Sequence, residues 1–327
     1  MIYLIVTLLL FAGMQVYTRL ANKYLIFDTP NHRSSHTKPT IRGGGVVFLL
    51  AIFFSGIFYH PVYWLPIMGA SLIGVIGFLD DNIGVAQSVR FGIHIISLSI
   101  LFYFLQLFST ATILGLIALY ILVAGIINAY NFMDGINGIT GLYSLVVLGG
   151  LQYVNLYQVS FIESDLIWFS MLSCLVFLFY NFRKKALVFA GDVGSITIAF
   201  WIMFLILELI ITTNNWIYLL FLTVYGVDTV LTIIHRLFLK QNIFEAHRLH
   251  FYQILANEQK ISHLLISVVY AVLQLLIIVF AVSTHLSFIN AFLISSLPLV
   301  IFYILMKPRL MKLGAPLKPI ILPDQFT

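Results

Sequence analysis

The sequence predicts an all-α polytopic membrane protein, and composition, hydropathy and the length of the apolar runs support this fold class. Of the 327 residues, 61% are apolar and only 9% are charged, whereas an ordinary soluble domain carries about 25% charged residues. The mean hydropathy is +1.04. Because so few charged side chains cannot cover a particle of 37.1 kDa in water, lipid must solvate most of its surface. A soluble globular protein is therefore excluded.

Eleven apolar runs reach or approach the roughly 20 residues that a helix needs to cross the hydrocarbon layer. The first run has no basic residue ahead of it and no small-residue cleavage site, so we expect a retained span rather than a cleaved signal peptide. No polar stretch is long enough to build a core of its own, and we expect a single integral membrane domain over residues 1–327. The predicted spans are 1–20, 43–59, 62–79, 91–108, 110–127, 139–157, 163–182, 193–213, 216–234, 261–281 and 286–306.

The basic residues predict the orientation of this bundle. All 17 Lys and Arg fall at alternate connections or in the C-terminal tail, and the other connections have none. Because basic residues favour the cytoplasmic side, we expect the N-terminus outside and the C-terminus inside. The net charge of +5 then reflects orientation, and nucleic-acid binding is not needed to explain it. The expected cytoplasmic loops lie near residues 21–42, 80–90, 128–138, 183–192 and 235–260.

The clearest candidate for chemistry is the acidic pair at the end of the third predicted span. Asp80 and Asp81 are adjacent, and two neighbouring carboxylates repel each other unless a cation neutralises them. Their hard oxygen atoms suit Mg²⁺ bridging a diphosphate. A solvated helix end, or a proton-relay carboxylate of a transporter, would explain the pair equally well.

A second motif follows the fifth predicted span and is rich in amides. Asn128, Asn131, Asp134 and Asn137 offer donors and acceptors for the edge of a base or a sugar. Asp-Gly and Asn-Gly are also common turn dipeptides. A turn would explain the glycines but not the two asparagines that precede them.

A third motif leads into the eighth predicted span. Asp192 lies at the expected helix start, where it could cap the helix or complete a metal site beside phosphates. Phe189 could stack on a nucleobase, although an aromatic residue at a span boundary is more often part of the interfacial belt.

A fourth motif lies in the longest late loop. His247 and His250 are three residues apart, so on a helix they share a face. Together with Arg248 they could bind phosphate oxygens. A solvated amphipathic loop beside an anionic leaflet is the simpler interpretation of this motif alone.

Taken together and in this order, the four motifs resemble the polyprenyl-phosphate N-acetylhexosamine-1-phosphate transferases of glycosyltransferase family 4. The resemblance runs from about Asp28 to Gln253. It implies a Mg²⁺-dependent phosphoglycosyltransferase whose catalytic and metal-binding carboxylates are Asp80, Asp81 and Asp192. It also implies that the substrate-binding residues are Asn128, Asn131, Asp134, Asn137, Phe189, Arg90, His247, Arg248 and His250.

The same resemblance implies the partners and the location. The expected donor is a UDP-N-acetylhexosamine, and the expected acceptor is undecaprenyl phosphate. The protein would lie among the lipids of a bacterial cytoplasmic membrane with its active site facing the cytoplasm, as a monomer or a homodimer. UMP and undecaprenyl-diphosphate-sugar would be the products, and they would initiate a cell-surface polysaccharide of the O-antigen type.

Two positions depart from the common family pattern. Many members have Asp where this chain has Asn137, and the family's histidine cluster often has more histidines than His247-Arg248-Leu249-His250. This form of the cluster, together with the Arg33–His36 and Pro39–Gly45 segments, is similar to the subgroup that uses a 6-deoxy-N-acetylhexosamine.

A polytopic secondary transporter is the alternative function. Such a protein would also combine many spans, few membrane carboxylates and one basic face. It would place its binding site near the bilayer midplane and show internal repetition, and the sequence has no visible repeat. Asp228 and Glu208 would be its best candidate carboxylates.

Overall fold

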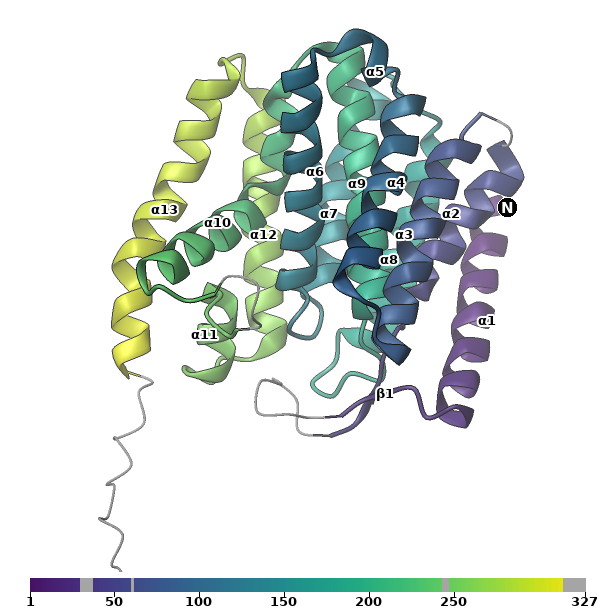
Figure 1. Ribbon diagram of the computed structural model, residues 1–327, viewed down its shortest axis with the longest axis horizontal. Coiled ribbons are helices and arrows are strands. Elements are labelled where there is room, and N and C mark those ends of the chain that lie inside the picture. Colours follow the sequence, from purple (N-terminus) through teal and green to yellow (C-terminus); the bar gives the residue numbers. More distant parts are fainter. Residues whose placement is uncertain (30–37, 60–61, 243–246, 314–327) are drawn as a thin grey trace, which may run out of the picture.

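The computed structural model describes residues 1–29, 38–59, 62–242 and 247–313, and these form a bundle of helices with one small hairpin (Figure 1). The Arg33–His36 segment of the first loop lies outside the described residues. The long helices are α1 (Ile2–Lys23), α2 (Val46–Tyr59), α3 (Trp64–Ile83), α4 (Gln87–Phe104), α6 (Ile113–Met133), α7 (Ile139–Tyr157), α8 (Ser164–Asn181), α9 (Gly191–Thr213), α10 (Thr223–Phe238), α12 (His263–Ser283) and α13 (Phe288–Leu313). The short elements are α5 (Leu107–Thr110), α11 (Phe251–Asn257), the 3₁₀ helix η1 (Trp216–Leu222), β1 (Phe27–Asp28) and β2 (Thr40–Ile41).

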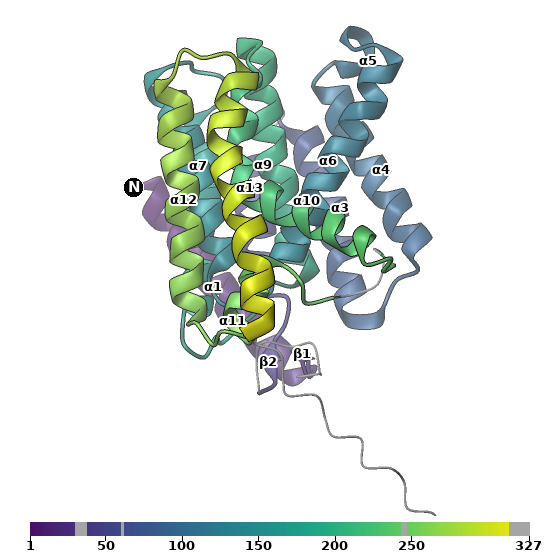
Figure 2. The ribbon, with the colours of Figure 1, turned by 90° about the vertical axis from the view of Figure 1, so that its left-hand side faces the viewer.

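The helices confirm the predicted fold class. Within the described residues, ten helical segments are long and apolar enough to cross a membrane. The second predicted span is the shorter helix α2, which has 14 residues. The ninth is broken, because η1 turns into α10 and α10 then runs obliquely to its neighbours in both views of the bundle (Figures 1 and 2).

Helix α9 is the centre of the bundle. Its sequence is apolar all round, and nearly all of its side chains are buried. A helix with this pattern must be surrounded by other elements or by lipid, and here α3, α6, α2 and α7 surround it. The start of α9 is consequently fixed relative to the end of α3, where Asp80 and Asp81 lie.

Glycines permit the closest of these contacts. A Cβ atom on Gly45 would lie 2.1 Å from the Cα atom of Gly194, and one on Gly77 would lie 3.0 Å from the backbone of Asp192. The backbones at the starts of α2 and α9 therefore touch directly. Small residues at helix crossings allow this close approach in membrane bundles.

A short hairpin links the first loop to the segment that precedes α9. Strands β1 and β2 are antiparallel, with Phe27 opposite Ile41. The amide of Phe189 donates to the carbonyl of Ile41 at 2.8 Å, and the amide of Gly44 donates to the carbonyl of Phe189 at 2.7 Å. The loop of the third motif is thereby held against the loop that carries Arg42.

We predict that Gly45→Ala destabilises the protein, because the added methyl group would overlap Gly194 and force α2 away from α9. An overpacked contact costs about 1–3 kcal/mol in the free energy of unfolding. The measurement is the apparent melting temperature of the purified protein in detergent micelles. Gly125→Ala is the matched control, since a Cβ atom there meets nothing within 4 Å. Equal melting temperatures for the two variants would contradict the close-contact interpretation.

Candidate active site

The motifs from distant parts of the chain meet at one end of the bundle. The acidic pair lies in the last turn of α3, and Asp192 lies in the first turn of α9. Asn131 is near the end of α6, which Asp134 caps. The packing of α3 and α6 against α9 brings these segments together. No acidic cluster of this kind lies at the middle of the bundle, within the described residues, as a midplane transport site would require.

Two arginines join the three carboxylates. Arg42 Nη2 lies 2.6 Å from Asp81 Oδ1 and 4.0 Å from Asp192 Oδ1. Arg90 forms an ion pair with Asp80 and places its Nη2 3.3 Å from Asp192 Oδ2. Asp192 therefore connects the two pairs, so that three carboxyl groups face two guanidinium groups.

Asp81 is the most enclosed of the three carboxylates. Its side chain is 1% exposed, and its Oδ2 atom also accepts a hydrogen bond from the Val193 amide at 3.4 Å. Gly191 has a φ angle of 70°, and a Cβ atom on it would lie 2.4 Å from Asp81 Oδ2. Only glycine suits both this backbone conformation and this contact. The turn before α9 is thus shaped around the carboxylate.

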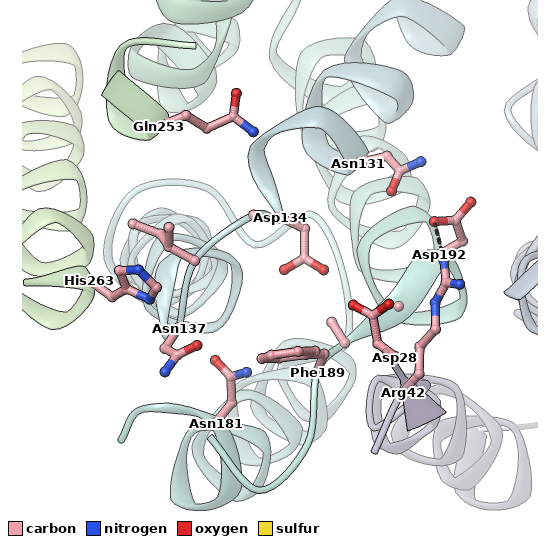
Figure 3. Close-up of a pocket in the computed structure, with 14 residues that line it drawn as sticks. Asp28, Arg42, Asn131, Asp134, Asn137, Asn181, Phe189, Asp192, Gln253 and His263 are labelled. Carbon is pink, nitrogen blue, oxygen red and sulfur yellow. Dashed lines mark ion pairs between the residues drawn. The ribbon is translucent and has the colours of Figure 1, made fainter. Parts of the chain in front are cut away.

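A polar cavity of about 280 Å³ opens beside the carboxylates (Figure 3). Asp134 and Phe189 face its centre, and Asp192 and Arg42 lie together on one side. The cavity is lined by Asp28, Arg42, Asn131, Asp134, Gly135, Ile136, Asn137, Asn181, Phe189, Ala190, Gly191, Asp192, Gln253 and His263. Asp80, Asp81 and Arg90 do not line it but contact residues at its edge, because Arg90 pairs with Asp192 and Asp81 pairs with Arg42.

Amide side chains fix the wall opposite the arginines. Asn181 donates to the carbonyl of Val188 at 2.8 Å and accepts from the amide of Gly138 at 2.6 Å. Asn137 donates to the carbonyl of Arg183 at 2.7 Å. These bonds tie the loop after α6 to the loop after α8, so that the wall is rigid before any ligand arrives. Such preorganisation lowers the cost of binding.

Asp134 is an acid whose ionisation this environment alters. Burial raises the pKa of its carboxyl group to about 7. The Thr140 hydroxyl, which donates to Asp134 Oδ1 at 2.5 Å, partly offsets this increase. The nearby carboxylates of Asp192 and Asp81 also raise the pKa. Asp134 therefore changes charge near neutral pH.

The histidine motif lies next to this cavity but does not line it. His247, Arg248 and His250 are absent from the cavity wall, to which α11 contributes Gln253 instead. The His247 and His250 rings are 4.9 Å apart, and both contact Phe132 of α6. Burial lowers the pKa of His247 to about 3, so it is neutral at pH 7. Phosphate contact by the histidines stays a prediction.

A buried carboxylate holds this histidine loop in place. Asp228 of α10 accepts hydrogen bonds from the Phe251 amide at 2.9 Å and from the Tyr270 hydroxyl at 2.8 Å. Its Oδ1 atom lies 3.4 Å from His250 Nδ1. Tyr252 in turn donates to the carbonyl of Phe132 at 2.8 Å. The carboxylate that sequence reasoning had considered for a transporter is thus part of the support of this loop.

Sequence reasoning missed several residues of the site. Arg42, Asn181, Gln253 and His263 line the cavity although none was assigned a role. Only Arg42 carried a signal, because it directly precedes three glycines. Conversely, Asn128 was expected near the ligand, but it lies outside the cavity wall and its amide donates to the carbonyl of Ala124 at 2.8 Å.

The carboxylates suit a hard divalent cation. Asp80, Asp81 and Asp192 supply oxygen atoms, which Mg²⁺ prefers, and they outnumber the two arginines that pair with them. Among the described residues, no three His, Cys, Asp or Glu side chains form a ready-made ligand set. A cation here would therefore share its coordination with water and substrate phosphates, as Mg²⁺ usually does.

Comparison with known proteins gives consistent relatives. Residues 63–210 match the family described as glycosyl transferase family 4. The chain is 29% identical over 254 residues to a probable undecaprenyl-phosphate N-acetylglucosaminyl 1-phosphate transferase of Bacillus subtilis, covering 72% of this chain and 71% of the relative. It is 27% identical over 238 residues to a phospho-N-acetylmuramoyl-pentapeptide-transferase of Streptococcus sanguinis, covering 64% and 71% of the two chains. The corresponding protein of Petrotoga mobilis is 30% identical over 208 residues, covering 55% and 64%.

We predict that Arg42 and Asp81 are energetically coupled. Arg42→Gln removes the cation that faces a buried carboxylate, which should lower the free energy of unfolding by about 1–3 kcal/mol. In an Asp81→Asn background, Arg42→Gln should lower the free energy of unfolding by a smaller amount, and the difference should be about 1 kcal/mol or more. Denaturation of the four proteins of this cycle measures the coupling, with the exposed Arg19→Gln as the control. Strictly additive effects would contradict it.

We also predict that Asp134 makes stability depend on pH. The pKa of the Asp134 carboxyl group is raised to about 7 in the folded state from an unfolded value near 4. Its contribution to the free energy of unfolding is therefore fully present below about pH 4. The contribution is lost as the pH rises through 7. Asp134→Asn should therefore flatten the decrease of melting temperature between pH 4 and 8 while keeping the Thr140 hydrogen bond. If the melting temperatures of variant and wild type changed with pH in the same way, the carboxyl group would ionise normally.

Proposed function

Because the chain belongs to glycosyl transferase family 4, we propose that it transfers an N-acetylhexosamine-1-phosphate from a UDP-sugar to undecaprenyl phosphate. The products would be undecaprenyl-diphosphate-sugar and UMP. The two relatives' names share the transfer of a phosphorylated N-acetyl sugar, and one of them names undecaprenyl phosphate. The acceptor and the identity of the donor sugar are part of the proposal for this chain.

One observation carries the proposal. Three carboxylates and two arginines from separate segments meet at the edge of a polar cavity at one end of a membrane bundle. A transporter needs its charged site inside the bundle. A phosphotransferase that joins a soluble nucleotide to a lipid needs its site where membrane and water meet, and this is where a helix-end cluster lies.

The cavity offers distinct subsites for the parts of a UDP-sugar. The Phe189 ring can stack on uracil, and the amides of Asn137 and Asn181 mark the side of the cavity farthest from the carboxylates. The diphosphate would then extend toward Arg42 and Asp192, where guanidinium groups can hold phosphate oxygens. This assignment puts the scissile bond beside the carboxylate cluster.

The reaction is a displacement at phosphorus. An oxygen of the undecaprenyl phosphate attacks the β-phosphorus of the UDP-sugar, and the bond between that phosphorus and the bridging oxygen breaks, so that the oxygen leaves with UMP. A phosphate monoester with a second pKa near 6 is already mostly dianionic at neutral pH, so no general base is required. Positioning and charge stabilisation would supply most of the rate enhancement.

The arrangement of Asp80 favours a supporting role. Its Oδ1 atom accepts a hydrogen bond from the Val85 amide at 2.8 Å, and its other oxygen is paired with Arg90. An oxygen held by a guanidinium group is a poor nucleophile. We therefore favour direct transfer over a covalent intermediate, with Asp80 orienting Arg90 toward the leaving phosphate.

Mg²⁺ is the proposed cofactor. Asp80, Asp81 and Asp192 would hold the ion, and when bound it would neutralise negative charge on the diphosphate. Arg42 and Arg90 reach the same region and offset the remaining charge. The protein thus gathers positive charge where UMP becomes more negative, which is the usual source of stabilisation in phosphoryl transfer.

The proposed biological role is the initiation of a cell-surface polysaccharide of the O-antigen type. The site would face the cytoplasm of a bacterium, where UDP-sugars are made. The His247–His250 pattern supports a 6-deoxy-N-acetylhexosamine as the sugar. A panel of UDP-N-acetylhexosamines in the assay described next distinguishes this donor from UDP-N-acetylglucosamine.

We predict that Asp80→Asn, Asp81→Asn and Asp192→Asn each lower transfer at least about 100-fold, because each removes a carboxylate that would hold Mg²⁺ or orient an arginine beside the diphosphate. The measurement is UMP release by detergent-solubilised protein supplied with a UDP-N-acetylhexosamine, undecaprenyl phosphate and Mg²⁺. Asp165→Asn is the matched control, since Asp165 lies in the first turn of α8 and contacts Tyr3. Wild-type rates in all three site variants would contradict the proposed function.

A further inference from the structure

A second cavity lies on the outside of the bundle, between α10 and α13. It has a volume of about 440 Å³, and its walls are mostly apolar. Helix α10 runs obliquely to α13 (Figure 2), and the groove lies between the two helices. The groove is lined by Leu231, Ile234, His235, Phe238, Tyr303, Ile304, Lys307, Pro308 and Met311.

The groove contains a buried cation. Lys307 is 2% exposed. Its ammonium group donates to the hydroxyl groups of Tyr303 and of Thr232, the latter at 3.4 Å, and lies 4.5 Å from the centre of the Tyr303 ring. In the described part of the chain it forms no ion pair with a carboxylate. Its direct partners are neutral hydroxyl groups, and the buried Asp228 carboxylate is connected to it only through Thr232. A buried ammonium group without a directly paired anion is costly.

A second polar residue lines the same groove. His235 lines the groove, and its Nδ1 atom is buried without a hydrogen-bond partner among the described residues. Nδ1 and the Lys307 ammonium group could therefore both serve one acceptor group. Several oxygen atoms on one centre, as in a phosphate, suit such a pair.

The position of the groove points to a lipid. Lys307 lies four residues before the end of the apolar segment of α13, or about 6 Å along the helix, which is close to the headgroup level. Near this end of α13, Phe251 of α11 packs on Tyr303, and the centres of the two rings are 5.6 Å apart. The apolar walls are open to the membrane, since Ile304 and Phe238 are exposed.

The groove is separate from the reacting groups. None of its lining residues lines the polar cavity or belongs to the carboxylate cluster. A phosphate bound by Lys307 would therefore not be the phosphate that attacks the UDP-sugar. This separation favours a lipid of the surrounding bilayer over the polyprenyl acceptor.

We propose that the α10–α13 groove binds an anionic phospholipid, whose phosphate contacts Lys307 and His235 and whose acyl chains lie along Leu231, Ile234 and Ile304. The bound lipid places a phosphate directly beside Lys307, which Asp228 reaches only through Thr232, and fills the groove between α10 and α13. Because Thr232 also donates to Asp228 Oδ1 at 3.2 Å, the lipid site adjoins the support of the histidine loop.

The test is native mass spectrometry of the full-length protein released from detergent, with phosphatidylglycerol or phosphatidylcholine of the same acyl chains added. We expect phosphatidylglycerol to be retained more strongly by the wild type. Lys307→Met should lower its apparent affinity about tenfold or more, as for loss of a charged hydrogen bond. Lys307→Arg should restore it, and Lys240→Met, at an exposed lysine outside the groove, should leave it unchanged.

Other results would overturn the proposal. Equal retention of the two phospholipids by the wild type, or unchanged phosphatidylglycerol binding by Lys307→Met, would show that no anion site exists. A third result would assign the groove to the polyprenyl acceptor instead. In that case undecaprenyl phosphate at equal concentration would displace phosphatidylglycerol from the wild type, whereas Lys307→Met would bind the two lipids equally weakly. His235→Phe, expected to weaken binding several-fold, provides the same test if Lys307→Met does not fold.

Discussion

The rest of the site depends on the neutralisation of an enclosed carboxylate by a guanidinium group. Asp81 is almost completely buried beside two other acids, and a charge in such a place is expensive unless it is paired. Arg42 supplies the pairing from a different part of the chain. Because Arg42 also reaches toward Asp192, the same interaction fixes the ends of α3 and α9 relative to each other.

Backbone contacts make this electrostatic arrangement possible. Gly45 and Gly194 let α2 and α9 touch, and the hairpin strand β2 pairs with the segment before α9 through Ile41 and Val188. The loop that carries Arg42 and the loop that carries Phe189 are consequently one structural unit. A change in either loop should be felt both by the carboxylates and by the proposed nucleobase subsite.

A second unit lies on the other side of the cavity. Asp228 binds the amides at the start of α11, and Tyr252 of this helix reaches the carbonyl of Phe132. Gly135 lies against the Tyr252 hydroxyl, since a Cβ atom there would be 2.2 Å from it. The histidine loop and the amide motif are thus coupled, although the histidines do not line the cavity. At this junction the His250 ring contacts the rings of both Phe132 and Tyr252.

Much of this fold could be predicted from the sequence, because membrane spans follow from the length of apolar runs. All eleven predicted spans correspond to helices, and Asp80, Asp81 and Asp192 lie at one end of the bundle. The family resemblance is confirmed, whereas the roles of individual site residues and of Mg²⁺ stay predictions. The contact between Arg42 and Asp81 could not be predicted, because it joins residues 39 positions apart through tertiary packing alone. The break between η1 and α10 is likewise invisible, since Leu222 and Thr223 continue one apolar run.

The central claim is that Asp80, Asp81 and Asp192 act together on a divalent cation beside the bound nucleotide. Electron paramagnetic resonance with Mn²⁺ as a substitute for Mg²⁺ tests it most directly, in purified protein with UDP-N-acetylglucosamine present. The account predicts a stoichiometric bound-Mn²⁺ signal that disappears in Asp192→Asn and persists in Asp165→Asn. An unchanged signal in Asp192→Asn, or none in the wild type, would contradict it.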